Sequence, residues 1–182
     1  AGLGGSRPRP AAVLLAADDI ARKYTDQPLK IIGSGQASDY PLHDRDDLTS
    51  IQAAKLAAQE AYQMSGLGPE EIQVAEVHDC FTIAEVIAIE DLGFFKPGSG
   101  FQQAELGTTS RDGRIPVNPS GGLKAKGHPV GASGVGQTVE IFKQLRGRAG
   151  ERQIPGDPRI GLTHNVGATG QTCVVHIYQR EE

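Results

Sequence analysis

Short apolar segments alternate with helix-like segments along most of this chain of 182 residues. Five apolar segments have the length and the flanking turn residues of strands, at 11–16, 29–32, 72–77, 160–163 and 173–178. Helices are expected over residues 17–24, 47–64, 82–92 and 133–145. This alternation predicts an α/β domain in which helices layer on a mixed, mostly parallel sheet. The last two strands have too short a connection for a helical crossover, so we expect that pair to be antiparallel.

The composition indicates one globular domain rather than a disordered or fibrous chain. Hydrophobic residues make up 38% and charged residues 22%, which are ordinary values for a globular domain of this length. The opening AGLGGSRPRP predicts a flexible leader over residues 1–10, followed by the domain over residues 11–182. A start at Ala rather than Met leaves a fragment, a processed product and a separate subunit all open.

Charge and hydropathy exclude several classes of partner. A net charge of −4 argues against a nucleic-acid-binding protein, which would normally carry a basic face. No apolar run is long enough to cross a bilayer, and no secretory signal is recognisable. Cys80 and Cys173 are therefore expected to be free thiols in a reducing compartment. We expect a cytoplasmic protein that binds neither membranes nor nucleic acids.

The stretch from Asn118 to Gly136, NPSGGLKAKGHPVGASGVG, is the most informative part of the sequence. It places His128 between a glycine and Pro129, directly before a helix start built of small residues. Glycine lets the backbone approach a ligand closely, and proline fixes φ beside the histidine. Neither the phosphate-binding Gly-Lys-Ser/Thr ending nor the dinucleotide pattern G-x-G-x-x-G is present here. The loop is therefore expected to serve a ligand other than a nucleoside triphosphate or NAD.

Three reactive positions follow predicted strands or glycine-rich turns, where open α/β sheets bind their ligands. They are the segment His78-Asp79-Cys80-Phe81, His128, and the segment His164-Asn165-Val166-Gly167. A helix start after Cys80 is expected to favour its thiolate. A tight turn after His164 is expected to expose backbone N–H groups suited to an oxyanion hole. Together these positions predict acyl chemistry by general acid–base catalysis.

Each position also has a plain structural interpretation. Cys80 fits an inert core residue, and His164 fits a turn histidine. Cys173 alternates with apolar residues along a strand and is interpreted as core packing, whereas His176 is interpreted as a residue on the sheet face without a catalytic role. His43 lies among aspartates and is interpreted as a solvated loop residue.

A zinc site is the remaining alternative for the same side chains. His78, Cys80, His128 and His164 are of the residue types that zinc prefers. No C-x-x-C or H-x-x-x-H spacing accompanies them, so no metal site is predicted.

Five segments occur in one order along the chain, and any one of them alone would be weakly specific. They are Glu76–Phe81, Pro116–Gly122, Gly127–Pro129, Gln144–Gly147 and His164–Gly167. In this order they resemble the C-terminal half of a thiolase, of the branch that contains sterol-carrier-protein-type and archaeal-type acetyl-CoA acetyltransferases and lipid-transfer-protein-like members. The resemblance runs from about residue 11 to residue 180 and implies a thiolase-like half-fold.

The resemblance also implies roles for the three histidines and for Cys80. His128 would activate the nucleophilic cysteine and help to bind the thioester oxygen. His78 would hold the water, or the oxygen itself, of the first oxyanion hole. His164 stands where the family usually has an acid/base cysteine, and Cys80 would supply that thiol from the opposite side of the pocket.

A second oxyanion hole is implied near Val166. A backbone N–H would form it, with Asn165 and Gly167 on either side. Ala168 follows where this branch commonly has a second glycine, a departure that is expected to alter the turn.

The family's nucleophilic cysteine lies in the other half of a thiolase, and no such segment occurs here. We therefore expect a C-terminal acyl-CoA acyltransferase domain that does not turn over alone and binds coenzyme A or acyl-CoA as substrate, without a bound cofactor. The resemblance implies an N-terminal thiolase half, a homo-oligomer and possible pairing with a zinc-ribbon/OB-fold subunit. Two alternatives stay open: a thiolase-like retro-aldolase acting on acyl-CoA, and a non-catalytic half-scaffold that binds acyl-CoA or a partner.

Overall fold

The computed structural model describes residues 10–181. The helices are α1 (Asp18–Ala21), α2 (Gln52–Ser65), α3 (Thr82–Asp91), α4 (Gly100–Glu105), α5 (Gly122–Lys126) and α6 (Ser133–Leu145). The strands are β1 (Leu29–Ser38), β2 (Val74–Glu76), β3 (Ile160–Gly167) and β4 (Thr172–Arg180). Residues 1–9 of the predicted leader lie outside this description. No helix within residues 10–181 is both long enough and apolar enough to cross a bilayer.

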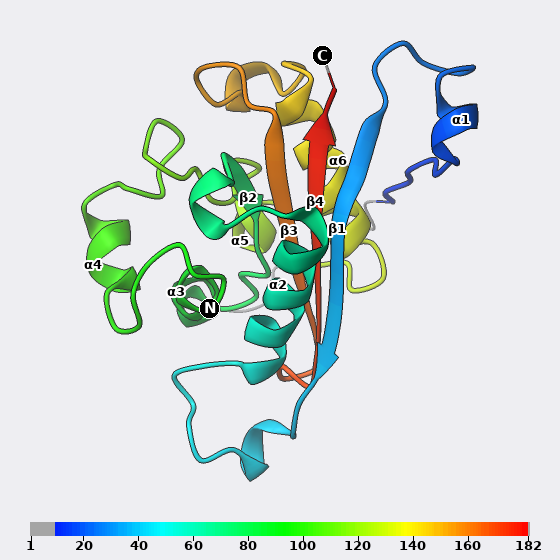
Figure 1. The fold of residues 1–182 in the computed structure, drawn as a ribbon. Coiled ribbons are helices and arrows are strands. Elements are labelled where there is room, and N and C mark those ends of the chain that lie inside the picture. Colours follow the sequence, from blue (N-terminus) through cyan, green and yellow to red (C-terminus); the bar gives the residue numbers. More distant parts are fainter. Residues whose placement is uncertain (1–9, 182) are drawn as a thin grey trace.

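The sheet has the strand order β1-β4-β3-β2, with helices on both faces (Figure 1). β2 and β3 run parallel, whereas β3–β4 and β1–β4 are antiparallel. A parallel bridge from Ala75 to Val117 adds one more segment beside β2. The mixed α/β architecture and the antiparallel final pair are as predicted. The sheet is less parallel than expected because β1 pairs with the outer side of β4.

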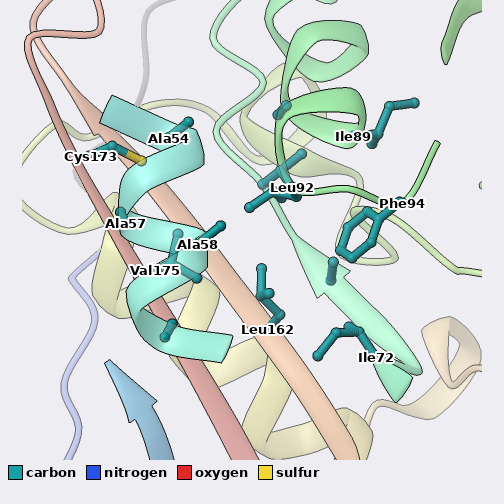
Figure 2. Packing of buried hydrophobic residues seen from close by; sticks show 14 of the residues in the cluster. Ala54, Ala57, Ala58, Ile72, Ile89, Leu92, Phe94, Leu162, Cys173 and Val175 are labelled. Atoms are coloured by element: carbon teal, nitrogen blue, oxygen red, sulfur yellow. The ribbon is translucent and has the colours of Figure 1, made fainter. Parts of the chain in front are cut away.

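Two glycines of β1 allow α2 to pack directly against the sheet. The sequence predicted a strand over residues 29–32 that ran out into Gly33-Ser34-Gly35, but β1 continues to Ser38. A Cβ atom at Gly33 or Gly35 would overlap a backbone carbonyl of α2. The facing side of α2 consists of small side chains, each 2% exposed or less: Ala53, Ala54, Ala57, Ala58 and Ala61. Figure 2 shows several of these alanines against Cys173 and Val175 of β4.

The opposite face of the sheet is covered by α6, which packs mainly on β3 and β2 (Figure 1). Ile141 and Leu145 of α6 contact a second apolar cluster that includes Val74 and Tyr178. Gly161 of β3 lies directly under Ile141, where an added Cβ would be too close to the Ile141 side chain. The sheet is thus enclosed by α2 on one face and α6 on the other.

The first predicted strand, over residues 11–16, is wrong. This segment has no regular structure, and Leu14 and Leu15 are 101% and 77% exposed. A strand needs a neighbouring strand for its hydrogen bonds, and in the described sheet β1 is the edge with no pairing to this segment. The helix that follows, α1, is also shorter than the predicted range 17–24.

Candidate active site

Three chain segments run in the same direction and end at one edge of the sheet. β2 and β3 are parallel, with Glu76 opposite Thr163, and Val117 lies parallel to β2. The chain continues from these points to His78 and, within β3, to His164, while the loop after Val117 leads to His128. Parallel pairing therefore gathers the three histidines at the edge where open α/β sheets bind ligands.

His78 is the centre of this group. Its ring meets the ring of His128 edge-on, with the ring centres 4.9 Å apart and the planes at 84°. Its backbone N–H donates to Nδ1 of His164 at 3.5 Å. The structure thus brings together three of the four predicted catalytic side chains.

A hydrogen bond to Ser133 orients the ring of His128. Its Nδ1 lies 2.7 Å from the hydroxyl of Ser133, and that hydroxyl donates to the carbonyl of Pro129 at 3.1 Å. A serine hydroxyl has one proton to donate, and when that proton goes to Pro129 the hydroxyl accepts from Nδ1–H of His128. In that arrangement Nε2 of His128 keeps a free lone pair that can act as a base.

The ring of His78 is held by Asn165. Nδ1 of His78 lies 3.3 Å from Nδ2 of Asn165, whose amide also donates to Gln137 at 3.0 Å. Nδ1 of His78 accepts this bond, so its proton lies on Nε2. Burial, and secondarily the charge of His128, lower the pKa of His78 to about 4. His78 is therefore neutral near pH 7 and presents an N–H donor.

His164 is a buried neutral side chain. It is 1% exposed, and burial followed by the charge of His78 lowers its pKa to about 3. Because Nδ1 accepts the His78 backbone N–H, the ring proton lies on Nε2, which has no hydrogen-bond partner among the described residues. This arrangement favours holding the His78 backbone over transferring protons at neutral pH.

The expected activation of Cys80 as a thiolate is wrong. Cys80 lies two residues before α3 and is partly buried. Burial raises the pKa of its thiol, Asp79 raises it further, and the nearby backbone N–H groups and Lys124 only partly oppose this. Desolvation outweighs the helix start here, so Cys80 remains a protonated thiol near neutral pH.

The predicted second oxyanion hole lies inside a strand. Val166 and Gly167 are paired with Cys173 and Thr172 of β4, so β3 continues beyond the expected turn. The turn itself follows, and Ala168 adopts a positive φ of 52° there, in a region that suits glycine better. Residues of an antiparallel pair alternate in their hydrogen bonding, and since the backbone N–H of Arg180 donates to the carbonyl of Arg159, Val166 opposite Cys173 turns its N–H away from β4. The oxyanion hole near Val166 stays a prediction, and Asn165 contributes through its side chain.

Other interpretations of single residues agree with the structure. Cys173 is fully buried in the main apolar cluster, and burial raises its pKa to about 12. His176 lies half-buried on the sheet face in β4, and the His43 side chain is 80% exposed beside Asp44. Within residues 10–181, no three His, Cys, Asp or Glu side chains form a group that could hold a metal ion.

Sequence reasoning missed the polar residues that support the histidines. Ser133 and Gln137 lie on the buried side of α6, and Gln137 also donates to the carbonyl of His164 at 3.1 Å. The available signal was their spacing, because Ser133 and Gln137 lie one helical turn apart on a side that also carries Ile141. A polar row on a buried helix face indicates a hydrogen-bonded site.

Comparison with known proteins agrees with this geometry. A family model described as Thiolase C-terminal domain-like matches residues 34–180. The chain is 53% identical over 171 residues to an acetyl-CoA acetyltransferase of Methanothermobacter thermautotrophicus, covering 93% of this chain and 44% of that protein. It is 37% identical over 175 residues to sterol carrier protein 2 of Oryctolagus cuniculus, covering 93% of this chain and 32% of that protein. The chain thus spans less than half the length of these curated relatives.

Solved structures give the same fold. The structure of an Ltp2-ChsH2(DUF35) aldolase matches with a TM-score of 0.79 and 28% identity, covering 89% of this chain and 42% of that one. A monomeric SCP2-thiolase-like protein of Mycobacterium smegmatis matches with a TM-score of 0.61 and 19% identity, covering 83% of this chain and 28% of that one.

Proposed function

The chain belongs to the thiolase C-terminal domain-like family, and we propose that it supplies the acid–base and oxyanion-binding half of a cytoplasmic thiolase-type acyl-CoA acyltransferase. One observation carries the proposal. Two imidazoles meet at one sheet edge: His128, whose Nδ1 is hydrogen-bonded to Ser133, and His78, with an Nε2–H. A base beside a neutral donor is the pair that thioester chemistry requires.

In the direction of thiolysis, the proposed reaction gives a role to His128, His78 and Cys80. Nε2 of His128 accepts the proton of a cysteine thiol, and the resulting thiolate attacks the β-carbonyl of a 3-ketoacyl-CoA. Nε2–H of His78 donates to the oxygen that becomes negative. When the carbon–carbon bond breaks, the thiol of Cys80 gives its proton to the enolate of acetyl-CoA. Coenzyme A then gives its proton to the Cys80 thiolate and attacks the acyl-cysteine, and the cysteine thiolate that leaves recovers its proton from His128; no bound cofactor takes part.

The nucleophilic cysteine of this scheme lies outside these 182 residues. Cys173 is buried in the core, and Cys80 is assigned to the proton transfer. A second polypeptide segment must therefore bring the nucleophile to the histidines, and we expect the chain to be inactive without it.

α6 offers the surface for such a segment. It carries the half-buried Val135 and Val139 and the exposed Phe142, spaced one to two turns apart, and a Cβ added at Gly136 beside them would meet no atom within 4 Å. Ile31 of β1 is also 44% exposed. An apolar surface of this kind marks an interaction site, and we assign it to the N-terminal thiolase half. Homo-oligomers and a zinc-ribbon/OB-fold subunit are further proposed partners, the latter because the solved Ltp2-ChsH2(DUF35) aldolase is named for two components.

The test is thiolysis by the protein as isolated from its source, with any linked or associated segment retained. We expect acetoacetyl-CoA and coenzyme A to give two molecules of acetyl-CoA. His128→Ala should abolish turnover, whereas His43→Gln should leave it unchanged, since His43 is solvated. Full activity of His128→Ala, or no turnover by an intact complex that contains a reactive cysteine, would refute the assignment.

Retro-aldol cleavage of a β-hydroxyacyl-CoA is the second candidate, favoured by the structural match to a solved aldolase. The two reactions differ in their need for coenzyme A, because an aldolase releases its product without an acyl acceptor. Cleavage of a β-hydroxyacyl-CoA without added coenzyme A would support the aldolase. Binding of acyl-CoA without either reaction would support a non-catalytic half-scaffold.

A further inference from the structure

Two acidic residues flank His78 on the same short segment, and both bind the loop that carries His128. Glu76 precedes His78 by two residues and Asp79 follows it directly. We propose that Glu76, through its buried ion pair with Lys126, is a positioning residue that sets the contact between His78 and His128. The importance of that contact for catalysis rests on the proposed function, but the contact itself does not.

Glu76 binds the loop at two points. Its carboxylate accepts from the backbone N–H of Ser120 at 3.0 Å and from the Ser120 hydroxyl at 2.6 Å. It also accepts from Nζ of Lys126 at 2.9 Å, and the same Nζ donates to the Ser120 hydroxyl at 3.0 Å. Lys126 is only two residues before His128. The ion pair therefore fixes the chain at the last charged residue before the catalytic loop histidine.

Asp79 and Asn118 hold the rest of the loop. Asp79 accepts from the backbone N–H of Leu123 at 2.7 Å, at the start of α5. Asn118 accepts from the backbone N–H of Val77 at 2.8 Å and donates to Glu85 at 2.8 Å. The segment that carries His78 and the loop that carries His128 are thus tied on both sides of the histidine contact.

Glu76 differs from the other ties because its completely buried carboxyl pairs with a lysine. Its side chain is 0% exposed, whereas that of Lys126 is 22% exposed. Burial raises the pKa of Glu76, and Lys126 and Ser120 oppose this rise. A buried carboxylate is held in place strongly only while its partners remain, so loss of Lys126 leaves it without compensation. Removing either partner should therefore release the loop end next to His128.

The test is NMR of the labelled chain at neutral pH, with no substrate or nucleophile present. In the unmodified chain we expect a cross-ring NOE between His78 and His128 and a single tautomer for each ring. In Lys126→Met and Glu76→Gln we expect a weaker NOE and mixed tautomers of His128. A displacement of about 1 Å is enough to impair a catalytic pair. Because an NOE falls with the sixth power of distance, the same displacement from the 4.9 Å ring separation lowers it about threefold.

Two further variants separate positioning from general loosening. Glu140→Gln removes another buried carboxylate, which pairs with Arg152 at 3.1 Å, and should leave the histidine NOE unchanged. Lys126→Arg keeps the charge and should keep the NOE, and Lys126→Met tests the pair if Glu76→Gln does not fold. An unchanged NOE in folded Lys126→Met, or an equal loss in Glu140→Gln, would overturn the proposal. Because no turnover is measured, failure of the proposed enzymatic function would not produce either result.

Discussion

The buried histidines should make the fold sensitive to mild acid. His78 and His164 have pKa values lowered to about 4 and about 3, mainly by burial. In the unfolded chain both return to about 6.5. The unfolded chain then binds protons more readily, so the stability that these residues contribute is present above pH 6.5. It is lost as the pH falls from 6.5 towards the folded-state pKa values.

The size of the effect follows from these values. At pH 6 an ordinary histidine is about three-quarters protonated, while a group with a pKa of about 4 or about 3 is almost entirely neutral. Each histidine should therefore lower the free energy of unfolding by about 1 kcal/mol between pH 8 and pH 6. At pH 5 the loss should reach about 2 kcal/mol for each residue. Glu76, Glu85 and Asp91 oppose this, because burial raises their pKa values and acid then favours the folded state.

Comparing the unmodified chain with a histidine variant removes the contribution of the carboxylates, because both proteins share it. Urea unfolding at pH 8 and pH 6 gives the free energy for the unmodified chain and for His164→Asn. We expect the variant to lose about 1 kcal/mol less over this interval. His43→Gln is the matched control and should not differ from the unmodified chain, since His43 is exposed. An equal loss in the unmodified chain and His164→Asn would refute the assignment of His164 as a buried neutral side chain.

Three other predictions concern single residues. Iodoacetamide near neutral pH should modify Cys80 slowly and Cys173 only after unfolding, as measured by peptide mass spectrometry, because only Cys80 is partly exposed; equal rates would contradict this. Ala168→Gly should raise the free energy of unfolding by about 1 kcal/mol in urea, since it relieves the positive φ. Gly35→Ala should lower the free energy of unfolding by about 3 kcal/mol, seen as a lower midpoint of thermal unfolding, because its Cβ would overlap the α2 backbone. Gly136→Ala should raise the midpoint slightly, because its Cβ would meet open space.

The grouping of the histidines was predictable because it depends on strand direction alone. A strand followed by a helix implies parallel pairing, and parallel strands place their carboxyl ends at one edge. The parallel register of Glu76 with Thr163 then brings His78 to His164. The sequence also indicated the loop that delivers His128, through its glycines and Pro129.

Features that depend on distant contacts were not predictable in this way. Gly33 and Gly35 have poor strand propensity, so they indicated the end of a strand. They belong to β1 because the alanines of α2, which follow later in the chain, leave room only for a residue without Cβ. Cys80 is a similar case, since a local helix start predicts a thiolate and only the packed structure reveals the desolvation that reverses it.

The inner side of α6 explains how a buried site is compatible with a stable sheet. Its first half presents Ser133 and Gln137 to the histidines, and its second half presents Ile141 and Leu145 to the apolar cluster. Buried polar groups cost stability unless they are hydrogen-bonded. Gln137 uses both ends of its amide, donating to the His164 carbonyl and accepting from Asn165. One helix therefore anchors the sheet through its C-terminal half and orders the imidazoles through its N-terminal half, so that displacing α6 would disturb the core and the site together.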